Sequence, residues 1–396
     1  MLDKPRATDN FDRDSQGRIV KNEGNLLRAI SWAGIELSFD DFGHDYCIAG
    51  LEGYGPRLDD DALDELFLLI AREYFFKMPV TDFRRIVRAA ARRNRFHPVR
   101  NYLSGLRWDG LERLDTWLID YAGAPDTPFV RAVGRIMLIA AVRRVRDPGC
   151  KFDEMLVLES PEGRDKSTAF RVLAGEEWFT DEMPLNSSSR EVIEQLRGHW
   201  IIECADLKGL RKAEVTTLKA FLSRQVDTAT LKYKEETTRF KRQCIFVGTT
   251  NEANYLLSTT GNRRFWPVPI DYFDIDALRQ ARDQLWAEAA LCEDTGESIR
   301  LSRTLWDVAR EEQSQRTAID EWDEIIAEWL EAESRERNLI SPDGDRTKLK
   351  DVAKDALNIT ADKLDQRAIE RIAKGLRAAG WMRIKTNSGN WWVREA

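Results

Sequence analysis

The spacing of hydrophobic residues predicts a helical beginning for this chain. From about residue 25 to residue 102, apolar residues recur at three- and four-residue steps, which is typical of amphipathic helices. Three helices are expected here, in the stretches NLLRAISWAGI, DDDALDELFLLIAREYFF and FRRIVRAAARRNRF. A second helical block is expected from Leu111 to Arg146, and the Asp-Pro-Gly sequence at 147–149 would end it with a turn.

Short apolar runs bounded by turn residues then indicate buried strands. The expected strands lie within MLVL (155–158), HWIIECADL (199–207), CIFVGTTN (244–251) and TGNRRFWPVPI (260–270). Helical patterns separate them, one beginning at Lys166 and one running from Lys212 to Leu222, and residues 225–243 indicate a β-hairpin or an irregular basic segment. Strands that alternate with helices favour an α/β fold built on a parallel sheet.

The last third of the chain returns to helical spacing and ends in a hairpin. Residues 274 to about 335 are helical in pattern and acidic, and two further helical segments follow a Ser-Pro-Asp-Gly turn at 341–344. Two short strands around residues 387–390 would close a winged-helix-like domain. The expected organisation is therefore a disordered segment or linker (1–24), a helical N-terminal domain (25–105), an α/β domain with its preceding helical block (106–300), and a helical linker with the winged-helix-like domain (301–396).

Composition excludes several classes of protein. The 396 residues are 42% hydrophobic and 33% charged, and no apolar run approaches the roughly 20 residues of a membrane span. The polar N-terminus carries no visible secretory signal. Five cysteines lie far apart without metal-ligand spacing, and Cys204 and Cys244 sit in apolar runs where buried thiols are expected. We expect a cytoplasmic protein with no membrane association.

Charge is distributed unevenly along the chain, although its net value is −7. The segment from Arg84 to Arg107 contains no acidic residue, whereas 281–338 is strongly acidic. From Ile340 onward there are twelve Lys and Arg residues against eight Asp and Glu residues. Local asymmetry of this kind matters more to a polyanionic partner than the total charge does. For the arginine-rich helix, a solvated face and a surface that meets DNA or a subunit remain equal alternatives.

The stretch MLVLESPEGRDKSTAF (155–170) has the layout of a phosphate-binding P-loop, with a strand, a tight loop and a Lys-Ser pair that opens a helix. Backbone N–H groups of such a loop face phosphates. Lys166 would add a charge between the β- and γ-phosphates, and the Ser167 hydroxyl would ligate Mg²⁺. The candidate nucleotide-binding residues are Gly163, Asp165, Lys166, Ser167 and Thr168.

Two residues depart from the usual loop pattern. Ser160 and Asp165 stand where glycines are common, and the Asp165 carboxylate would oppose a polyanion. Aspartate tolerates a left-handed backbone better than most residues, so the turn itself can form. Taken alone, the loop could equally be an ordinary connection between a strand and a helix.

Polar residues at the ends of the later strands supply what ATP hydrolysis needs beyond a phosphate cradle. Glu203 and Asp206 could hold Mg²⁺ and polarise the attacking water, and Asn251 could sense the γ-phosphate. Arg263 or Arg264 could reach a neighbouring subunit's nucleotide. Each also has a simpler explanation, as a strand-end polar residue, a turn residue or an ion-pair partner. Their order along the chain favours an ATPase.

These motifs resemble the virulence-associated E family, a family of phage and plasmid replication proteins similar to superfamily 3 helicases of the AAA+ class. The resemblance covers about residues 25–299 well and the tail more loosely. It is carried by LRWDGLERLDTWL (106–118), KFDEMLVLESPEGRDKSTAFRVLAG (151–175), WIIECADL (200–207), LKAFLSRQVDTATLKYK (218–234), FVGTTN (246–251) and TGNRRFWPV (260–268).

The resemblance implies an α/β P-loop ATPase that uses ATP and Mg²⁺, with Ser167 and Asp206 as metal ligands. It implies a homo-oligomeric ring, a hexamer, acting on single-stranded or forked DNA during replication of a phage, prophage or plasmid. The segment with Arg224, Lys232 and Lys234 looks like the basic loop that such helicases direct into the central pore. Longer relatives carry an N-terminal primase domain, which we do not expect before Asn25.

Two hypotheses therefore follow from the sequence. The first is a ring-forming ATPase with helicase or translocase activity, and the second is a DNA-binding or assembly module whose altered loop hydrolyses ATP weakly or not at all. In the C-terminal domain, Trp381, Trp391 and Trp392 could contact DNA or form a core. The charged side of one helix could meet phosphates or solvent, and its residues are Arg367, Arg371, Lys374 and Arg377.

Overall fold

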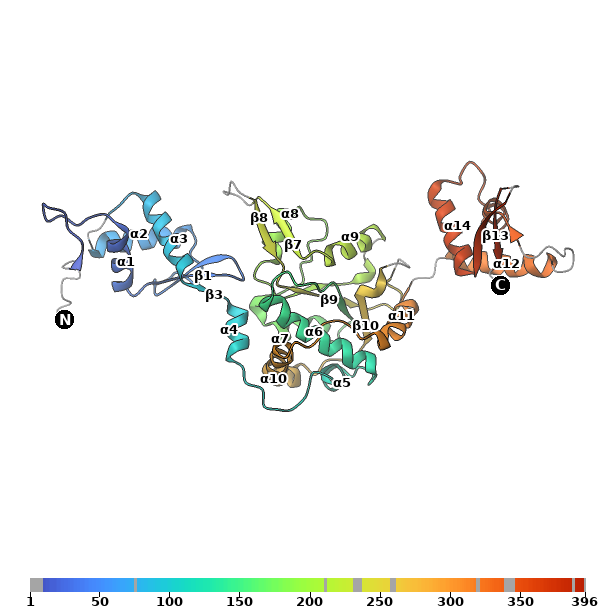
Figure 1. The fold of residues 1–396 in the computed structure, drawn as a ribbon, viewed down its shortest axis with the longest axis horizontal. Helices are drawn as coiled ribbons and strands as arrows, with labels where there is room; N and C mark the ends of the chain where they lie inside the picture. Colours follow the sequence, from blue (N-terminus) through green and yellow to red (C-terminus); the bar gives the residue numbers. More distant parts are fainter. Residues whose placement is uncertain are drawn as a thin grey trace. The chain divides into compact units, whose positions relative to one another are not determined.

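A computed structural model describes residues 10–74, 77–209, 212–230, 237–256, 261–317, 321–337, 346–386 and 389–394. The chain divides into two compact units, with the boundary between Gln315 and Arg316. The boundary lies later than the predicted residue 301 because helix α11 (Trp306–Gln315) packs against strand β10 (Phe265–Pro269) of the first unit. Figure 1 shows the fold and labels many of its helices and strands.

The centre of the first unit is a five-stranded parallel sheet, which confirms the predicted α/β core. Its strand order is β10-β4-β9-β6-β5, and every neighbouring pair is parallel. The other four strands are β4 (Met155–Glu159), β5 (Phe179–Thr180), β6 (Ile201–Cys204) and β9 (Ile245–Thr250). The strand that precedes the candidate loop, β4, therefore lies between β9 and β10.

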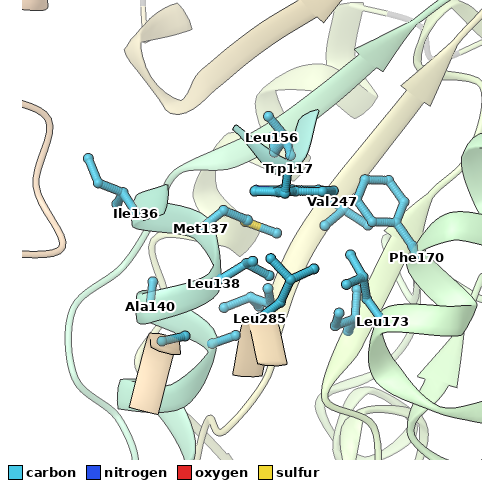
Figure 2. Close-up of a cluster of buried hydrophobic side chains, with 14 of the residues drawn as sticks. Trp117, Ile136, Met137, Leu138, Ala140, Leu156, Phe170, Leu173, Val247 and Leu285 are labelled. Carbon is cyan, nitrogen blue, oxygen red and sulfur yellow. The ribbon is translucent and has the colours of Figure 1, made fainter. Parts of the chain in front are cut away.

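Helices cover both faces of this sheet because the side chains of each strand alternate between the faces. On one face, Leu156, Val247 and Trp266 pack beneath helices that bury long apolar stripes. These helices are α4 (Pro98–Gly105), α5 (Trp117–Ala122), α6 (Pro128–Arg146), α7 (Lys166–Ala174) and α10 (Ile275–Asp294). Figure 2 shows Leu156 and Val247 of the sheet among side chains of α6, α7 and α10.

On the opposite face, Met155, Ile202 and Phe246 pack against two other helices, α8 (Ser189–Leu196) and α9 (Lys212–Leu222). The α9 helix has the bounds predicted from the sequence. An antiparallel hairpin of β7 (Val226–Ala229) and β8 (Thr238–Lys241) follows it, so the hairpin alternative for this segment is confirmed. The layers place the carboxyl ends of β4, β6 and β9 at one edge of the sheet.

The N-terminal part of the first unit has its own hydrophobic core. It contains the expected helices, as α1 (Glu23–Trp32), α2 (Asp60–Tyr74) and α3 (Val80–Arg93), but also a small sheet of β1 (Glu36–Asp40), β2 (Asp45–Ala49) and β3 (Arg95–Phe96). The sheet was not predicted, because β1 and β2 are only five residues long and mix polar with apolar positions.

The segment expected to be a linker is ordered where the structure describes it. Phe11 is buried in the N-terminal core, because its ring packs 5.1 Å from that of Trp32. The side chain of Asn25 donates to the carbonyls of Asp12 and Val20 and fixes the chain before α1. Residues 10–24 therefore belong to the N-terminal core.

The arginines of α3 are mostly paired with acidic residues of the same region. Arg84 contacts Asp60 and Asp64, and further ion pairs join Arg85 to Asp82 and Arg93 to Glu23. Arg95 of β3 likewise pairs with Asp41. Arg88 and Arg92 lie over the ring of Tyr46. These internal pairings favour the solvated-face alternative over a DNA-binding surface for this helix.

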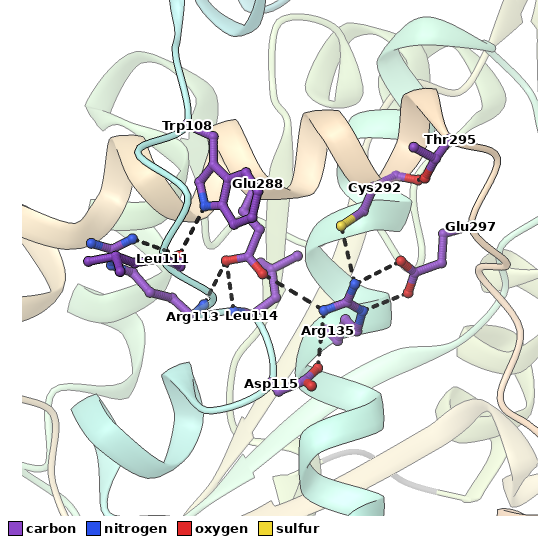
Figure 3. Close-up of polar contacts among 10 residues, drawn as sticks. All are labelled: Trp108, Leu111, Arg113, Leu114, Asp115, Arg135, Glu288, Cys292, Thr295 and Glu297. Carbon is purple, nitrogen blue, oxygen red and sulfur yellow. Dashed lines mark hydrogen bonds and ion pairs between the residues drawn. The ribbon is translucent and has the colours of Figure 1, made fainter.

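The segment before α5 is not helical, contrary to the prediction of a helix from Leu111. Residues 109–115 instead cross α10, where the buried carboxylate of Glu288 accepts from the backbone N–H groups of Arg113 and Leu114 at 2.7 and 3.1 Å. Arg135 of α6 binds Glu297 and Asp115 beside this contact. Figure 3 shows how these contacts fasten the segment to α10 and α6.

The second unit is a small domain of helices and an antiparallel sheet. Its helices are α12 (Glu321–Arg337), α13 (Leu349–Asp351), a π-helical turn (Val352–Ala356) and α14 (Gln366–Ala378). Its strands are β11 (Arg346–Thr347), β12 (Trp381–Thr386) and β13 (Gly389–Arg394), in the order β11-β13-β12. The hairpin of β12 and β13 confirms the predicted C-terminal hairpin. The Ser-Pro-Asp-Gly turn at 341–344 lies outside the described residues.

Among the residues that the structure describes, none of the helices has both the length and the apolar surface required to cross a membrane.

Candidate nucleotide site

The loop after β4 turns sharply before α7 begins. Gly163 and Asp165 both have a positive φ, of 70° and 57°, so the backbone uses the left-handed region twice. The Asp165 backbone angle shows why aspartate is tolerated here, since it enters this region more readily than most residues. The loop is anchored at its start, where the Ser160 N–H donates to the carbonyl of Thr250 on β9.

Lys166, the first residue of α7, turns its ammonium group back toward this loop. Its Nζ donates to the Ser160 carbonyl at 2.8 Å, to Ser160 Oγ at 2.9 Å and to the Pro161 carbonyl at 3.0 Å. It also donates to Asn251 Oδ1 at 2.9 Å. Burial lowers the pKa of Lys166, while the nearby charges of Glu203 and Glu162 act in the opposite direction.

Glu203 lies directly beside the beginning of α7. Its Oε1 accepts from Ser167 Oγ at 2.7 Å and from Thr249 Oγ1 at 2.5 Å. The residue is completely buried, and its Oε2 has no hydrogen-bond partner among the described residues. A buried carboxylate oxygen without a partner is costly, so the position calls for a water, an ion or a substrate proton.

A cavity of about 330 Å³ opens between this cluster and the loop. Glu162, Lys166, Ser167, Asp206 and Asn251 contribute to its lining, together with Gly163, Arg164, Asp165, Thr168, Ala205, Thr249 and Thr250. Its position at the carboxyl edge of a parallel sheet is where α/β folds bind their ligands. The volume also lies within the usual range for small-molecule sites.

The oxygen atoms at this cavity suit Mg²⁺ only in combination with further ligands. Ser167 Oγ and the carboxylates of Glu203 and Asp206 are hard oxygen donors, and Mg²⁺ normally combines one or two carboxylates with phosphate oxygens and water. Within the described ranges, no group of three or more His, Cys, Asp and Glu side chains could hold a metal ion. The donor set therefore fits a metal that arrives with phosphates.

Asp206 contributes differently from Glu203, although both were predicted as one acidic pair. Glu203 lies within β6, whereas Asp206 follows that strand with a φ of 47° and is exposed at the cavity wall. Asp165, also on the wall, receives a long hydrogen bond of 3.4 Å from Thr168 Oγ1. The charged residues that line the cavity are thus two cations and three carboxylates: Arg164 and Lys166 with Glu162, Asp165 and Asp206.

The two candidate arginines lie at the opposite edge of the sheet. They precede β10, which runs parallel to β4 with Phe265 beside Met155 and Pro269 beside Glu159. A five-residue strand spans about 16 Å, so neither arginine shares an edge with Lys166. The structure therefore does not bring Arg263 and Arg264 to the cavity of their own chain.

The two candidate arginines, Arg263 and Arg264, have different environments. Arg264 is held by Asp153 at 3.3 Å and by Ser223 Oγ at 2.8 and 3.1 Å. Arg263 is exposed and forms no hydrogen bond or ion pair with the part of the chain that the structure describes. The buried Nζ of Lys219 donates to Asn262 Oδ1 at 2.8 Å. Burial, with the charge of Arg264 as a smaller cause, lowers the pKa of Lys219 to about 8.

The base of the β7–β8 hairpin is fixed to the end of α9. Arg242 binds Asp227 through two hydrogen bonds of 2.6 and 3.0 Å and donates to the Phe221 carbonyl at 2.6 Å. Arg224 lies 3.9 Å from the same carboxylate and is half-exposed. Lys232 and Lys234, the other two candidate DNA-binding residues, lie outside the described residues.

Sequence reasoning missed two members of the cluster. Thr249 was noted only as part of a strand end, yet it is the second hydroxyl that binds Glu203. Glu162 accepts from Asn251 Nδ2 at 3.4 Å and stands in the loop as a further carboxylate. The Thr-Thr-Asn sequence at the end of β9 was the available signal for Thr249, because residues of neighbouring parallel strands share an edge.

The family model for the virulence-associated protein E-like domain matches residues 103–318, which is more than half of the chain. The chain belongs to the virulence-associated protein E-like family. The match contains the whole candidate site and both arginines, while α1–α3 and most of the second unit lie outside it. The predicted family is thereby confirmed.

Solved structures of similar fold accompany this virulence-associated E-like assignment. The apo structure of the NrS-1 C-terminal region has a TM-score of 0.55 and 10% identity, covering 95% of this chain and all of that one. An A-form apo structure of that region has a TM-score of 0.53 and 12% identity, with the same coverage. At such identities the likeness shows a shared fold. No curated protein matches the sequence.

Proposed function

We propose that this virulence-associated E-like protein is an ATP-hydrolysing replication protein of a mobile genetic element, acting as a ring that moves along or opens DNA. The observation that carries the proposal is the convergence of Lys166, Ser167 and Asn251 on one cavity, with Glu203 bonded to Ser167 directly behind the cavity wall. In this proposal the core is a P-loop ATPase of the AAA+ type, close to superfamily 3 helicases. The second unit is a winged-helix-like domain.

The side chains at the cavity divide the chemistry among them. Lys166 would exchange its loop oxygens for phosphate oxygens, and the loop N–H groups would face the same phosphates. Ser167 and Asp206 would hold Mg²⁺, which neutralises phosphate charge when it is bound. Glu203, with its buried unpaired Oε2, would orient the attacking water, and Asn251 would sense the terminal phosphate.

The separation of the two sheet edges supports action between subunits. Since Arg263 and Arg264 lie at the edge away from the cavity of their own chain, each could serve only a nucleotide held by a neighbour. The exposed Arg263 is the better candidate for that role, and Arg264 is better suited to anchor the turn, because Asp153 and Ser223 hold it. This arrangement requires a ring, and we propose a hexamer in the cytoplasm.

The decisive measurement is phosphate release from ATP, with and without single-stranded DNA. We expect hydrolysis that DNA stimulates and that Lys166→Ala reduces at least about a hundredfold. Lys151→Ala is the matched control, because Lys151 is an exposed lysine outside the cavity. This variant should hydrolyse ATP at the normal rate. Hydrolysis that survives in Lys166→Ala, or that is absent from the unmodified protein under both conditions, contradicts the proposal.

A second candidate function has specific support. Glu162 and Asp165 place carboxylates on the cavity wall, and Lys166 is already bound by four oxygens. These features favour a DNA-binding or assembly module with weak or no hydrolysis. DNA binding without ATP turnover in both the unmodified protein and Asp165→Gly would select this alternative.

A further inference from the structure

The three-stranded sheet of the second unit has two unlike faces. Trp381 and Trp392 are buried, at 6% and 3% exposure, in the core formed with α12 and α14. Successive strand residues point to opposite faces, so Trp391 lies on the other face of β13. It is only partly buried and does not belong to the core cluster. The register places Ile384 of β12 beside it.

Two cations lie against the ring of Trp391. The guanidinium carbon of Arg346 is 4.8 Å from the ring centroid, and the Lys348 ammonium is 4.4 Å from it. Arg346 stands opposite Val393 in the sheet, on the same face as Trp391. Met382, which stands opposite Val393 from the other side, is 43% exposed. We call this set of residues, Arg346, Lys348, Met382, Ile384, Trp391 and Val393, the outer face.

The strands that form the outer face contain no acidic residue. The cations of the outer face are Arg346 and, directly after β11, Lys348, whereas Arg383, Lys385 and Arg394 alternate to the opposite face of the same strands. Lys348 forms no ion pair with the described residues. The outer face is therefore positively charged, although the whole chain has a net charge of −7. It is complementary to a polyanion.

We propose that the outer face binds single-stranded nucleic acid, with an unpaired base stacked on Trp391 and flanking phosphates bound by Arg346 and Lys348. An aromatic ring between cations is the combination that single-strand binding uses. A stacked base is worth about five- to a hundredfold in affinity, whereas an exposed cation over a ring is worth about two- to fivefold. A base can therefore displace the two cations from the ring, and the displaced cations can then bind the flanking phosphates.

The same features favour single strands over a duplex or a protein partner. The bases of a duplex are stacked on each other and do not offer a face to Trp391. A protein partner would require a broad apolar patch, but Met382 is the one large hydrophobic residue that exceeds a third exposure on the described strands. This contact goes beyond the proposed function, because it needs neither ATP hydrolysis nor the hairpin residues Lys232 and Lys234.

The test is fluorescence anisotropy of labelled oligo-dT with the full-length protein, without nucleotide and across a salt series. Binding is measured in a Lys232→Ala, Lys234→Ala background to remove the hairpin contribution. In that background we expect Trp391→Ala to weaken binding at least about fivefold and Trp391→Phe to weaken it less. The double variant Arg346→Glu, Lys348→Glu should weaken binding at least tenfold. It should also reduce the slope of log K against log[salt] by about 1.4, because two phosphate contacts are lost.

The matched control is the pair Lys350→Glu and Lys354→Glu, which changes the charge equally on exposed residues away from the outer face. It should change binding less than about threefold. If Trp391→Ala unfolds the domain, as judged by thermal unfolding, Trp391→Phe and the charge reversals decide. Unchanged binding in the outer-face variants, or duplex binding as tight as oligo-dT binding, overturns the inference. If the unmodified protein does not hydrolyse ATP but binds oligo-dT through the outer face, only the proposed function is overturned.

Discussion

The two edges of the central sheet each carry a buried lysine, and these lysines have opposite surroundings. Lys166, at the carboxyl edge, is desolvated but lies near Glu203 and Glu162, whose charges favour its protonated form. Lys219, at the amino edge, is desolvated beside Arg264, which lowers its pKa further, to about 8. Burial alone therefore does not make a phosphate-binding lysine. The neighbouring charges determine whether the ammonium group persists.

The edges also differ in how completely their polar groups are satisfied. At the carboxyl edge, Glu203 keeps a buried oxygen without a partner in the described structure, next to an open cavity. At the amino edge, Arg264 is fully engaged by Asp153 and Ser223. The first edge is suited to receive a ligand and the second to support an exposed neighbour, Arg263. Four predictions test this comparison.

The largest effect is expected for Arg263→Ala. If Arg263 acts on the nucleotide of a neighbouring subunit, ATP turnover should fall about 10³-fold, as arginine fingers do elsewhere. Mixing this variant with Lys166→Ala should restore part of the activity, because mixed rings contain intact interfaces. Arg303→Ala is the control, since Arg303 is an arginine of the same unit outside both edges. Normal ATP turnover in Arg263→Ala would contradict the proposal that Arg263 acts on the nucleotide of a neighbouring subunit.

The next largest effect is expected for Glu203→Gln. The amide keeps the shape of the side chain but cannot polarise water, so ATP turnover should fall at least about a hundredfold while nucleotide binding persists. Turnover and the binding of a fluorescent nucleotide are measured on the same preparation. Glu159→Gln is the matched control, because Glu159 ends β4 at the same edge without lining the cavity. Equal losses of ATP turnover in both variants would contradict a specific role of Glu203 in hydrolysis.

A smaller effect in the opposite direction is expected for Asp165→Gly. The change removes a carboxylate from the cavity wall and places glycine at a φ of 57°, which glycine adopts freely. Relief of about 1 kcal/mol of charge repulsion should tighten nucleotide binding about fivefold. Asp181→Gly, at an exposed position away from the loop, controls for the loss of one negative charge. Weaker binding in Asp165→Gly would mean that the carboxylate organises the loop.

The smallest effect concerns the stability of the amino edge. The folded-state pKa of Lys219 is about 8, below the ordinary value of 10.5, so between these values the unfolded chain binds more protons. The free energy of unfolding should therefore rise with pH across this window, by about 1 kcal/mol or more. Lys219→Met should lack this rise, as measured by urea unfolding at pH 8 and at about pH 10. Parallel pH profiles of the two proteins would contradict the pKa assignment.

Much of the core could be predicted because its signals are local. The strands of the sheet are short apolar runs, and α9 has the predicted bounds because its apolar spacing begins and ends clearly. The short strands β1 and β2 could not be predicted, since five mixed residues carry no periodic signal and their pairing fixes them. Residues 109–115 were misassigned because the buried Glu288, far away in sequence, determines their path.

The candidate site shows the same limit. The sequence named Lys166, Ser167, Glu203 and Asn251, but not that Glu203 would bind Ser167 and Thr249 while Asp206 stayed exposed. Those contacts depend on how far each residue lies along its strand. The edge occupied by Arg263 and Arg264 could have been inferred, since residues that precede a parallel strand lie at the end opposite to those that follow one.

The short turn between α9 and the β7–β8 hairpin has a mechanical consequence. Phe221 and Ser223 stand two residues apart, and one receives Arg242 from the hairpin base while the other receives Arg264 from the amino edge. Since both arginines bind the same helix end, the hairpin stem and the turn at 262–264 share one anchoring point at the end of α9. A displacement of this helix end would therefore be expected to alter both contacts together.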